Sequence, residues 1–282
     1  MIPTPSDNLP PAQWRLLLTH PATGAWNMAV DEAILRAVGQ GISLPTLRLF
    51  AWEPPCLSLG YAQPSSDVDH ARLAELGWHL VRRPTGGRAI LHTDELTYSV
   101  IGPLSDPRLA GSVLESYRCL ASALLAALHR INIPAEANPT SASPPHALKG
   151  PVCFEVPSNY EITVEGKKLV GSAQARRKEG VLQHGTLPLT GDLTRITQVL
   201  TFPDEATRQA AAQRLLSRAT TVELILGETV SWQAAADAVR TSFETTLNLS
   251  FTPQSLTPQE SVWTDSLVNE KFAHPAWTER NG

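Results

Sequence analysis

The sequence has few cysteines, no long apolar run and no excess of positive charge. Its 282 residues include 3 cysteines, an odd number without C-x-x-C spacing, which disfavours both a disulfide scaffold and a zinc site. No stretch of 18 or more apolar residues occurs, so a membrane-spanning helix is excluded. With 23 lysines and arginines against 27 aspartates and glutamates, the net charge is −4. We therefore expect neither nucleic acid nor a membrane as a partner.

The composition is that of a globular protein with a sizeable core, since 42% of the residues are hydrophobic and 18% are charged. The first residues, MIPTPSDNLPPAQW, have neither the basic segment nor the apolar segment of a signal peptide. We therefore expect a cytoplasmic protein. Prolines cluster at 1–11 and, with alanine and serine, at 132–152, which marks a polar tail and a long internal connection.

Hydrophobic periodicity predicts alternating strands and helices. Strands are expected over 14–20, 47–52, 57–60, 79–83, 89–92, 96–101, 160–164, 168–175 and 182–189. Helices are expected over 27–38, 69–77, 112–131, about 204–217 and about 231–247. The strands at 89–92 and 96–101 are expected to pair, and the last three to form a β-meander. Long helices beside hairpin-connected strands indicate an α+β fold with a largely antiparallel sheet.

A double-glycine turn, RRPTGGRA at 82–89, is the first candidate binding element. Glycine accepts positive φ and has no Cβ, so a ligand carbonyl or phosphate can approach the backbone amides. The alternative is an ordinary β-turn. The segment is neither a Walker loop nor a dinucleotide fingerprint, because no Gly-Lys-Ser/Thr follows and no helix begins there.

Cys153 is the candidate nucleophile. Cys56 lies in an apolar run and Cys119 in a well-patterned helix, so both are expected to be small buried hydrophobes. Cys153 instead stands where the second Pro-rich stretch ends, although composition alone also allows a structural cysteine. A nucleophilic cysteine needs a nearby cation or base that holds it as thiolate.

Two adjacent lysines in GKKLVGSAQ, at 166–174, are candidates for that cation. Strand alternation places Lys167 and Lys168 on opposite faces, so only one can point at a site. If it is Lys168, it shares its face with Val170 and Ser172. A solvated lysine at a hairpin turn is the alternative for each, and the histidines of two apolar strands, at 92 and 184, are by themselves more often core or surface residues.

Several segments occur together in the order found in the biotin/lipoate protein ligase superfamily: RRPTGGRAILHTDELTYSV, CFEVPSNYEI, GKKLVGSAQARR and LQHGTLPL. NMAVDEAIL, PTLRLFAWEPPCLSLGYAQ and WTER at 277–280 agree, so the resemblance covers about residues 14–280. Within the superfamily the sequence most resembles the LipM-type octanoyltransferases, because Cys153 precedes Lys168 by 15 residues. Lipoate ligases typically lack a cysteine there, and the other octanoyltransferase type carries its cysteine later in the chain.

This resemblance implies a mixed, largely antiparallel sheet flanked by helices, as in the catalytic domain of biotin and lipoate protein ligases. It places the catalytic domain at 14–250, after a flexible tail at 1–13, with a C-terminal extension at 251–282 packed on the same domain. It also implies an acyltransferase that needs no cofactor, ATP or metal. The octanoyl group would pass from octanoyl-acyl carrier protein to Cys153, and then to a lysine of a lipoyl domain, such as glycine cleavage H protein or 2-oxoacid dehydrogenase E2.

In this reading Lys168 lowers the pKa of the Cys153 thiol. The residues implied to bind substrate are Arg83, Thr85, Gly86, Gly87, Arg88, Ala89, His92, Gly171, Ser172, Ala173, His184, Gly185 and Thr186. Three alternatives stay open at this point. They are an ATP-dependent lipoate–protein ligase in which Lys168 contacts an acyl adenylate, a lipoyl-protein amidotransferase, and a non-enzymatic member that binds acylated carrier domains.

Overall fold

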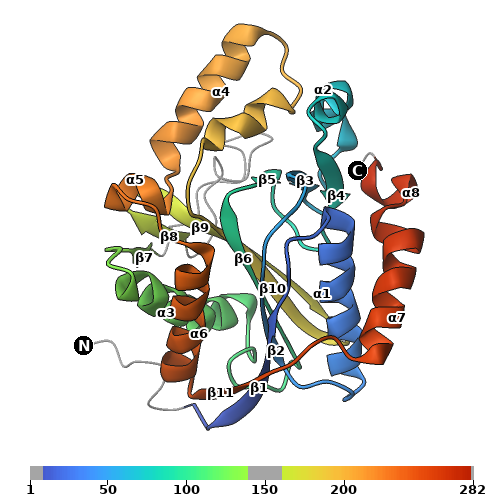
Figure 1. The fold of residues 1–282 in the computed structure, drawn as a ribbon, viewed down its shortest axis with the longest axis vertical. Helices are drawn as coiled ribbons and strands as arrows, with labels where there is room; N and C mark the ends of the chain where they lie inside the picture. The colour runs from blue at the N-terminus through green and yellow to red at the C-terminus, as the bar shows by residue number, and fades with distance from the viewer. Residues whose placement is uncertain (1–8, 139–160, 281–282) are drawn as a thin grey trace.

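An eight-stranded mixed sheet lies at the centre of the structure (Figure 1). The computed structural model describes residues 9–138 and 161–280, and the strand order is β11-β1-β2-β6-β10-β9-β8-β7. The strands are β1 (Ala12–Leu18), β2 (Thr46–Phe50), β6 (Glu95–Gly102), β7 (Glu136–Asn138), β8 (Glu161–Val164), β9 (Lys167–Arg177), β10 (Gly180–Pro188) and β11 (Leu249–Pro253). β1 runs parallel to β2 and β11, and the other neighbours are antiparallel. The predicted α+β class with a mixed, largely antiparallel sheet is confirmed.

The expected meander is present as β8, β9 and β10, but the expected pairing of 89–92 with 96–101 is wrong. β6 is buried along its whole length between β2 and β10, so both of its edges are occupied. The preceding strand, β5 (Ile90–His92), instead pairs with β3 (Cys56–Leu59) in a second sheet, which β4 (His79–Arg82) completes. The short connection from β5 to β6 therefore joins two sheets and is not a hairpin.

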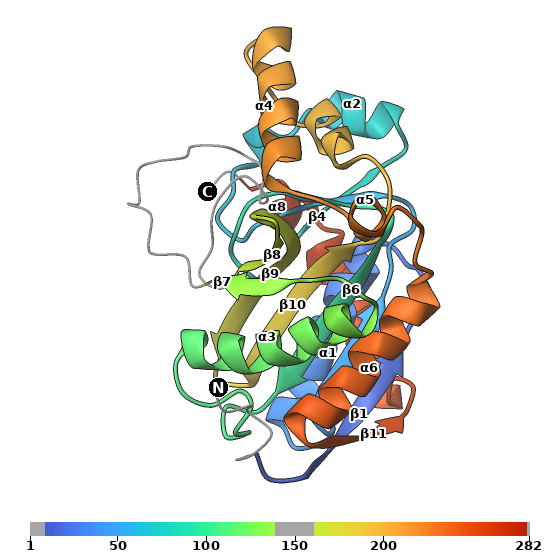
Figure 2. The ribbon, with the colours of Figure 1, turned by 90° about the vertical axis from the view of Figure 1, so that its left-hand side faces the viewer.

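Helices cover both faces of the large sheet (Figures 1 and 2). α3 (Val113–Arg130) and α6 (Trp232–Leu247) pack on one face, whereas α1 (Gly24–Gly39) lies on the other with α7 (Pro258–Leu267) against it. Alternate residues of a strand divide between these faces. In β1, Leu16 belongs to the core under α3 and α6, and Leu17 to the core under α1.

Side chains at the helix ends explain where the helices begin. Ser112 and Glu115 form a reciprocal capping box at α3, and Thr257 and Glu260 form one at α7. Asp69 caps α2 (His70–Glu75), and Gly77 follows with φ of +67°, the left-handed conformation common after a helix.

A smaller layer covers one end of the large sheet. The three-stranded sheet, α2, η2 (Ser65–Asp67), η4 (Leu193–Gln198) and α4 (Glu205–Arg218) lie together there, at the top of Figure 1. Leu57, Leu73, Val199 and Leu215 belong to the apolar cluster that joins them. α5 (Val222–Leu226) connects this layer to α6.

The C-terminal residues return to the body of the protein. β11 crosses residue 250, so the boundary expected there lies inside a strand of the large sheet. η5 (Val268–Phe272) packs on α1, and α8 (Pro275–Thr278) packs on β4. The buried Arg82 guanidinium donates hydrogen bonds to the carbonyls of Trp277, Thr278 and Arg280. Within the described ranges, no helix is both long enough and apolar enough to cross a membrane.

Candidate active site

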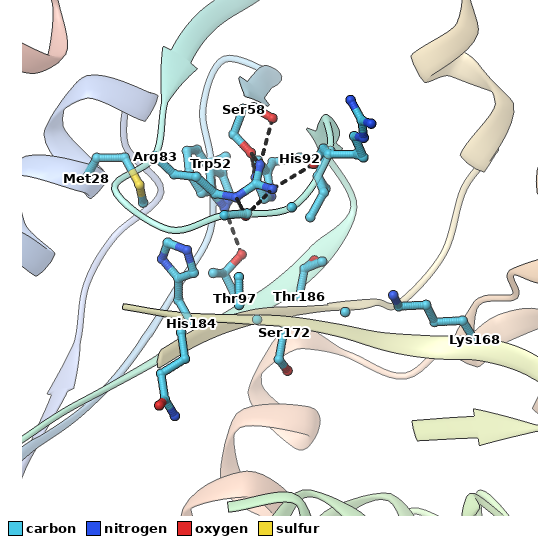
Figure 3. A pocket seen from close by; sticks show the side chains of 18 of the residues that line it. Met28, Trp52, Ser58, Arg83, His92, Thr97, Lys168, Ser172, His184 and Thr186 are labelled. Carbon is cyan, nitrogen blue, oxygen red and sulfur yellow. Dashed lines mark hydrogen bonds between the residues drawn. The ribbon is translucent and has the colours of Figure 1, made fainter. Parts of the chain in front are cut away.

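A cavity of about 450 Å³ lies between the double-glycine turn and the central strands β9 and β10 (Figure 3). Its walls come from both sheets, from the N-terminal part of α1 and, through Tyr117, from α3. The lining residues are Met28, Trp52, Ser58, Arg83, Gly86, Gly87, Arg88, Ile90, His92, Thr97, Tyr117, Lys168, Gly171, Ser172, Ala173, Gln174, His184, Gly185 and Thr186.

Most of the residues expected to bind substrate line this cavity, and Lys168 lines it too. Two do not. Ala89 is buried in the apolar cluster under the smaller sheet, and Thr85 turns its hydroxyl to His184. Thr85 also borders a neighbouring hollow along the outer side of the turn. Cys153 lies outside the described residues.

Arg83 holds the double-glycine turn in shape. Its guanidinium donates to the carbonyls of Ser58, Gly86 and Arg88, at 3.0, 2.9 and 2.7 Å. Gly87 has φ of +94°, and a Cβ on Gly60 would stand 1.9 Å from the Gly87 carbonyl oxygen. Glycine is therefore required at Gly87, in the turn, and at Gly60, which packs against it, and the Arg83 guanidinium holds the turn through its carbonyls.

Lys168 is 3% exposed and lines the cavity, whereas its neighbour Lys167 is exposed. The pairing of β8 with β9 skips one residue of β9, because Ile162 faces Val170 but Thr163 faces Lys168. An extra residue in a strand changes the face on which the preceding side chains lie.

The expectation that Lys168 shares a face with Val170 and Ser172 is therefore wrong. Val170 packs with α3 and α6, and Ser172 bonds to Tyr98. Figure 3 shows the side chain of Ser172, in β9, on the opposite side of the sheet from those of His184 and Thr186, in β10.

Glu161 is a site residue that sequence reasoning missed. Its carboxylate lies 2.8 Å from the Lys168 Nζ, and both side chains are largely buried. The signal was a glutamate at the start of an apolar strand, EITV, beside the strand that carries the lysine. Lys168 therefore acts as one member of an ion pair, in which the carboxylate offsets part of the electrostatic field of the ammonium.

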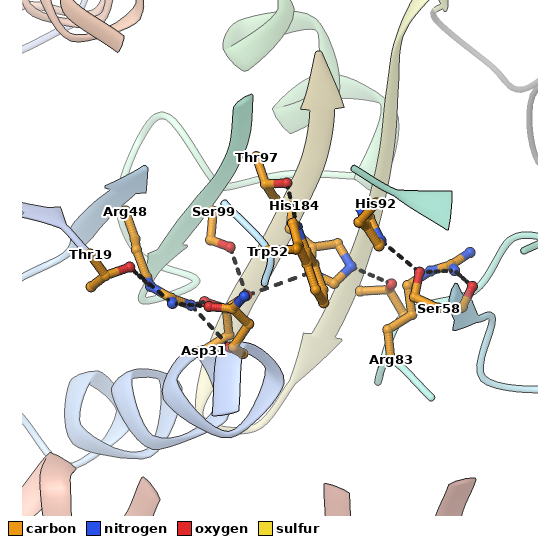
Figure 4. A network of polar contacts seen from close by, with 12 residues as sticks. Thr19, Asp31, Arg48, Trp52, Ser58, Arg83, His92, Thr97, Ser99 and His184 are labelled. Atoms are coloured by element: carbon orange, nitrogen blue, oxygen red, sulfur yellow. Dashed lines mark hydrogen bonds and ion pairs between the residues drawn. The ribbon is translucent and has the colours of Figure 1, made fainter. Parts of the chain in front are cut away.

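A buried polar network of side chains leads from β2 to the double-glycine turn (Figure 4). Arg48 binds Asp31 at 2.8 Å, and both side chains are 0% exposed. The His184 Nδ1 lies 3.6 Å from the Asp31 carboxylate, and its Nε2 lies 2.6 Å from the Thr85 hydroxyl. The polar network therefore joins α1, β10 and the turn. Neither Asp31 nor Arg48 was among the predicted site residues.

Burial and neighbouring charges set the charge states of Asp31 and His184 in this polar network. Burial alone raises the pKa of Asp31, but the Arg48 guanidinium, with His184 and Ser99, outweighs that effect and lowers it. Burial lowers the pKa of His184, against the opposing pull of Asp31. The imidazole is therefore neutral at pH 7. Because a carboxylate only accepts, the tautomer that suits both neighbours has its proton on Nδ1, toward Asp31, and accepts at Nε2 from the Thr85 hydroxyl.

A second polar cluster surrounds His92. Its Nδ1 lies 2.7 Å from Glu95, and its Nε2 lies 2.8 Å from the Ser58 hydroxyl. The indole of Trp52 stacks on the imidazole at 3.9 Å and donates to Thr97, which in turn donates to Glu95. The cluster fixes the ring at the junction of the two sheets. Ser58 and Trp52 lie far from His92 in the sequence, and no sequence pattern near His92 indicated that they would contact it.

Gly185 marks where the sheet has no room for a side chain. A Cβ there would lie 2.6 Å from the Tyr98 ring and 2.7 Å from the Ser172 hydroxyl. Tyr98 is buried, which raises the pKa of its phenol, and it accepts a hydrogen bond from Gln183. The side chains of Tyr98 and Ser172 thus leave no free space next to Gly185 on that face of the sheet. Among residues 9–138 and 161–280, no three His, Cys, Asp or Glu side chains gather as metal ligands would.

Comparison with known proteins places this geometry in a family. The sequence profile of the lipoyl protein ligase A/B catalytic domain matches residues 23–244. The octanoyltransferase LipM of Kyrpidia tusciae is 39% identical over 271 residues, which cover 95% of this chain and 98% of that protein. LipM of Moorella thermoacetica is 39% identical over 273 residues, which cover 96% and 100%. This chain belongs to the LipM-type octanoyltransferases.

Two solved structures similar to this octanoyltransferase are lipoate protein ligases. A bipartite ligase from Thermoplasma acidophilum has a TM-score of 0.79 and 26% identity, covering 95% of this chain and 96% of that one. A lipoate-protein ligase A solved with bound ATP has a TM-score of 0.76 and 26% identity, covering 95% and 98%. Family membership makes the chain an acyltransferase, and the fold is the one that the superfamily shares.

Proposed function

We propose that this chain transfers an octanoyl group from octanoyl-acyl carrier protein to a lysine of a lipoyl domain, through a thioester on Cys153. The observation that carries the proposal is the kinship with the LipM octanoyltransferases, which extends over 95% of the chain. The lipoyl-domain acceptor is supported by the Thermoplasma ligase, which was studied as part of a lipoylation system together with its E2 lipoyl domain.

The other two cysteines are poorly suited to the role of nucleophile. Cys56 is fully buried, and burial raises the pKa of its thiol. Burial also raises the pKa of Cys119, to about 11. Both therefore remain thiols near neutral pH, whereas an acyl acceptor reacts as the thiolate. This leaves Cys153 as the acyl-accepting cysteine of our proposal.

Lys168 supplies the cation in this proposal. Its ammonium is buried beside the cavity and is held by Glu161. A buried cation near sulfur favours thiolate over thiol, and each pKa unit corresponds to about 1.4 kcal/mol of preference. The Lys168–Glu161 pair would also keep that ammonium in one place while acyl groups and carrier domains exchange.

The proposed chemistry has two steps. First, the Cys153 thiolate attacks the thioester carbonyl carbon, and the phosphopantetheine thiolate of the carrier protein leaves. Second, the neutral lysine amine of the lipoyl domain attacks the same carbon, the Cys153 thiolate leaves, and the nitrogen loses a proton. An amide replaces a thioester, so the second step is downhill. Each buried methylene of the acyl chain contributes about 0.8 kcal/mol of binding.

The second candidate is an ATP-dependent lipoate–protein ligase, which the similarity to an ATP-bound ligase favours. The test supplies either octanoyl-acyl carrier protein without ATP, or free lipoate with ATP, to the wild type and to Cys153→Ala. We expect the wild type to modify a lipoyl domain with the first mixture, and Cys153→Ala to lose that activity. Modification with the second mixture alone, surviving Cys153→Ala, would instead establish the ligase. Cys119→Ala is the matched control and should behave as the wild type in both.

A further inference from the structure

Thr186 lines the cavity with a buried hydroxyl that has no hydrogen-bond partner among the described residues. The residue is 1% exposed. A buried polar group without a partner destabilises a fold, so such groups in native proteins are rare and call for an explanation. In a wall of a cavity, the simplest explanation is a bound molecule that supplies the missing partner.

Every other buried polar side chain of the cavity wall already has a partner within the protein. These side chains are Ser58 and His92, which bond to each other, His184, which meets Thr85, Thr97, which donates to Glu95, Lys168, which pairs with Glu161, and Arg83, which binds the turn. Among the described residues of the cavity wall, Thr186 is thus the one buried polar side chain without such a partner.

The position of Thr186 explains why its hydroxyl faces open space. Thr186 pairs with Thr97 of β6 on one side and with Gly171 of β9 on the other. The neighbouring backbone groups are engaged in the sheet ladder, and Gly171 has no side chain to approach the hydroxyl. Figure 3 shows Thr186 on the same side of β10 as His184 and Thr97, which is the cavity side.

The chemistry of the proposed substrate identifies the partner. An octanoyl thioester presents a hydrocarbon chain, a sulfur that accepts hydrogen bonds weakly, and one carbonyl oxygen that accepts them strongly. We infer that the Thr186 hydroxyl donates a hydrogen bond to the acyl carbonyl oxygen, and that this bond strengthens as the oxygen becomes an oxyanion. This inference rests on the proposed function. Because the same carbonyl reacts in both steps, Thr186 serves both.

Three variants test the inference. Thr186→Val keeps the shape of the side chain and removes the hydroxyl, Thr186→Ser keeps the hydroxyl, and Thr264→Val is the matched control. Thr264 has another buried hydroxyl without a partner among the described residues, but it lies in α7 and does not line the cavity. If Thr186→Val fails to fold, the smaller Thr186→Ala carries the same test.

The measurements are the single-turnover rate constants of the two steps, from octanoyl-acyl carrier protein to enzyme and from enzyme to lipoyl domain. We expect Thr186→Val to slow both by about 100-fold, the usual loss when one oxyanion donor is removed, with KM for the acyl donor little changed. Thr186→Ser and Thr264→Val should stay within about threefold of the wild type. The melting temperature of Thr186→Val should not fall.

Infrared spectroscopy of the enzyme acylated with ¹³C-carbonyl octanoate provides a readout that a structural role would not change. The carbonyl stretch should lie at lower frequency in the wild type and in Thr186→Ser than in Thr186→Val. Equal rates and equal frequencies in the wild type and Thr186→Val would overturn the inference while leaving the proposed function intact. If the wild type itself forms no octanoyl-enzyme, the proposed function and this inference both fall.

Discussion

Replacing Arg48 by methionine interrupts the buried polar network that leads to the double-glycine turn. Arg48 and Asp31 are both 0% exposed and 2.8 Å apart, so the substitution leaves a buried carboxylate without its cation. Removing one partner of such a pair costs about 3–5 kcal/mol. For 282 residues the entropy of unfolding is about 0.6 kcal/mol/K. The melting temperature should therefore fall by about 5–8 °C.

A second buried pair, far from the cavity, provides the control. Arg15 binds Glu260 through two hydrogen bonds of 2.8 and 2.7 Å, and neither side chain is exposed beyond 1%. Arg15→Met should lower the melting temperature by a similar amount. Only Arg48→Met should also slow octanoyl transfer per folded molecule, because only its pair orients His184 against the turn.

The assay compares calorimetric melting with transfer rates measured well below both transitions, where each variant is folded. An unchanged melting temperature in Arg48→Met would refute the stability argument. Equal transfer rates in the two variants would refute the link from the buried pair to the active site.

Three further predictions follow from the contacts described. Lys168→Ala should raise the pKa of the Cys153 thiol, measured as alkylation rate against pH, whereas Lys167→Ala should leave it unchanged; the reverse pattern would contradict the assignment. Gly185→Ala should cost about 1–3 kcal/mol of stability, because the new Cβ would stand 2.6 Å from the nearest carbon; an unchanged melting temperature would refute this. In acid, the native pKa of Asp31 is lowered, so its stabilising contribution is complete above the usual value of 3.8 and is lost as pH falls through the native value. Acid titration of unfolding should show this loss in the wild type, and Asp31→Asn should lack it.

The sequence predicts elements well where the signal is local, and less well where the partner is distant. The apolar stripe of α3 and the run of residues that forms β10 each lie within one element, and both elements were predicted within a few residues. The partner of β5 was not, because the short separation between the strands expected at 89–92 and 96–101 favours a hairpin. What overrides that preference is the burial of β6 between β2 and β10, which only the assembled sheet reveals.

The same distinction applies to the site. The double-glycine turn and the lysine pair were visible as motifs, and Lys168 does line the cavity. Its face was misjudged because an extra residue in β9 breaks the alternation. Asp31 could have been found, since it lies at helical spacing between Met28 and Leu35, on the buried face of α1. The Thr186 hydroxyl, which has no partner in the described part of the chain, could not, because only the structure shows which polar groups are hydrogen-bonded.

Intact-mass analysis of the enzyme mixed with octanoyl-acyl carrier protein, without ATP, tests the central claim most directly. We expect the wild type to gain the mass of one octanoyl group, mapped to Cys153 by peptide analysis and removed by hydroxylamine. Isolated octanoyl-enzyme should then pass the group to a lipoyl domain at least as fast as the complete reaction proceeds. Octanoyl transfer by Cys153→Ala at the wild-type rate, or an isolated octanoyl-enzyme that cannot transfer, would contradict the account.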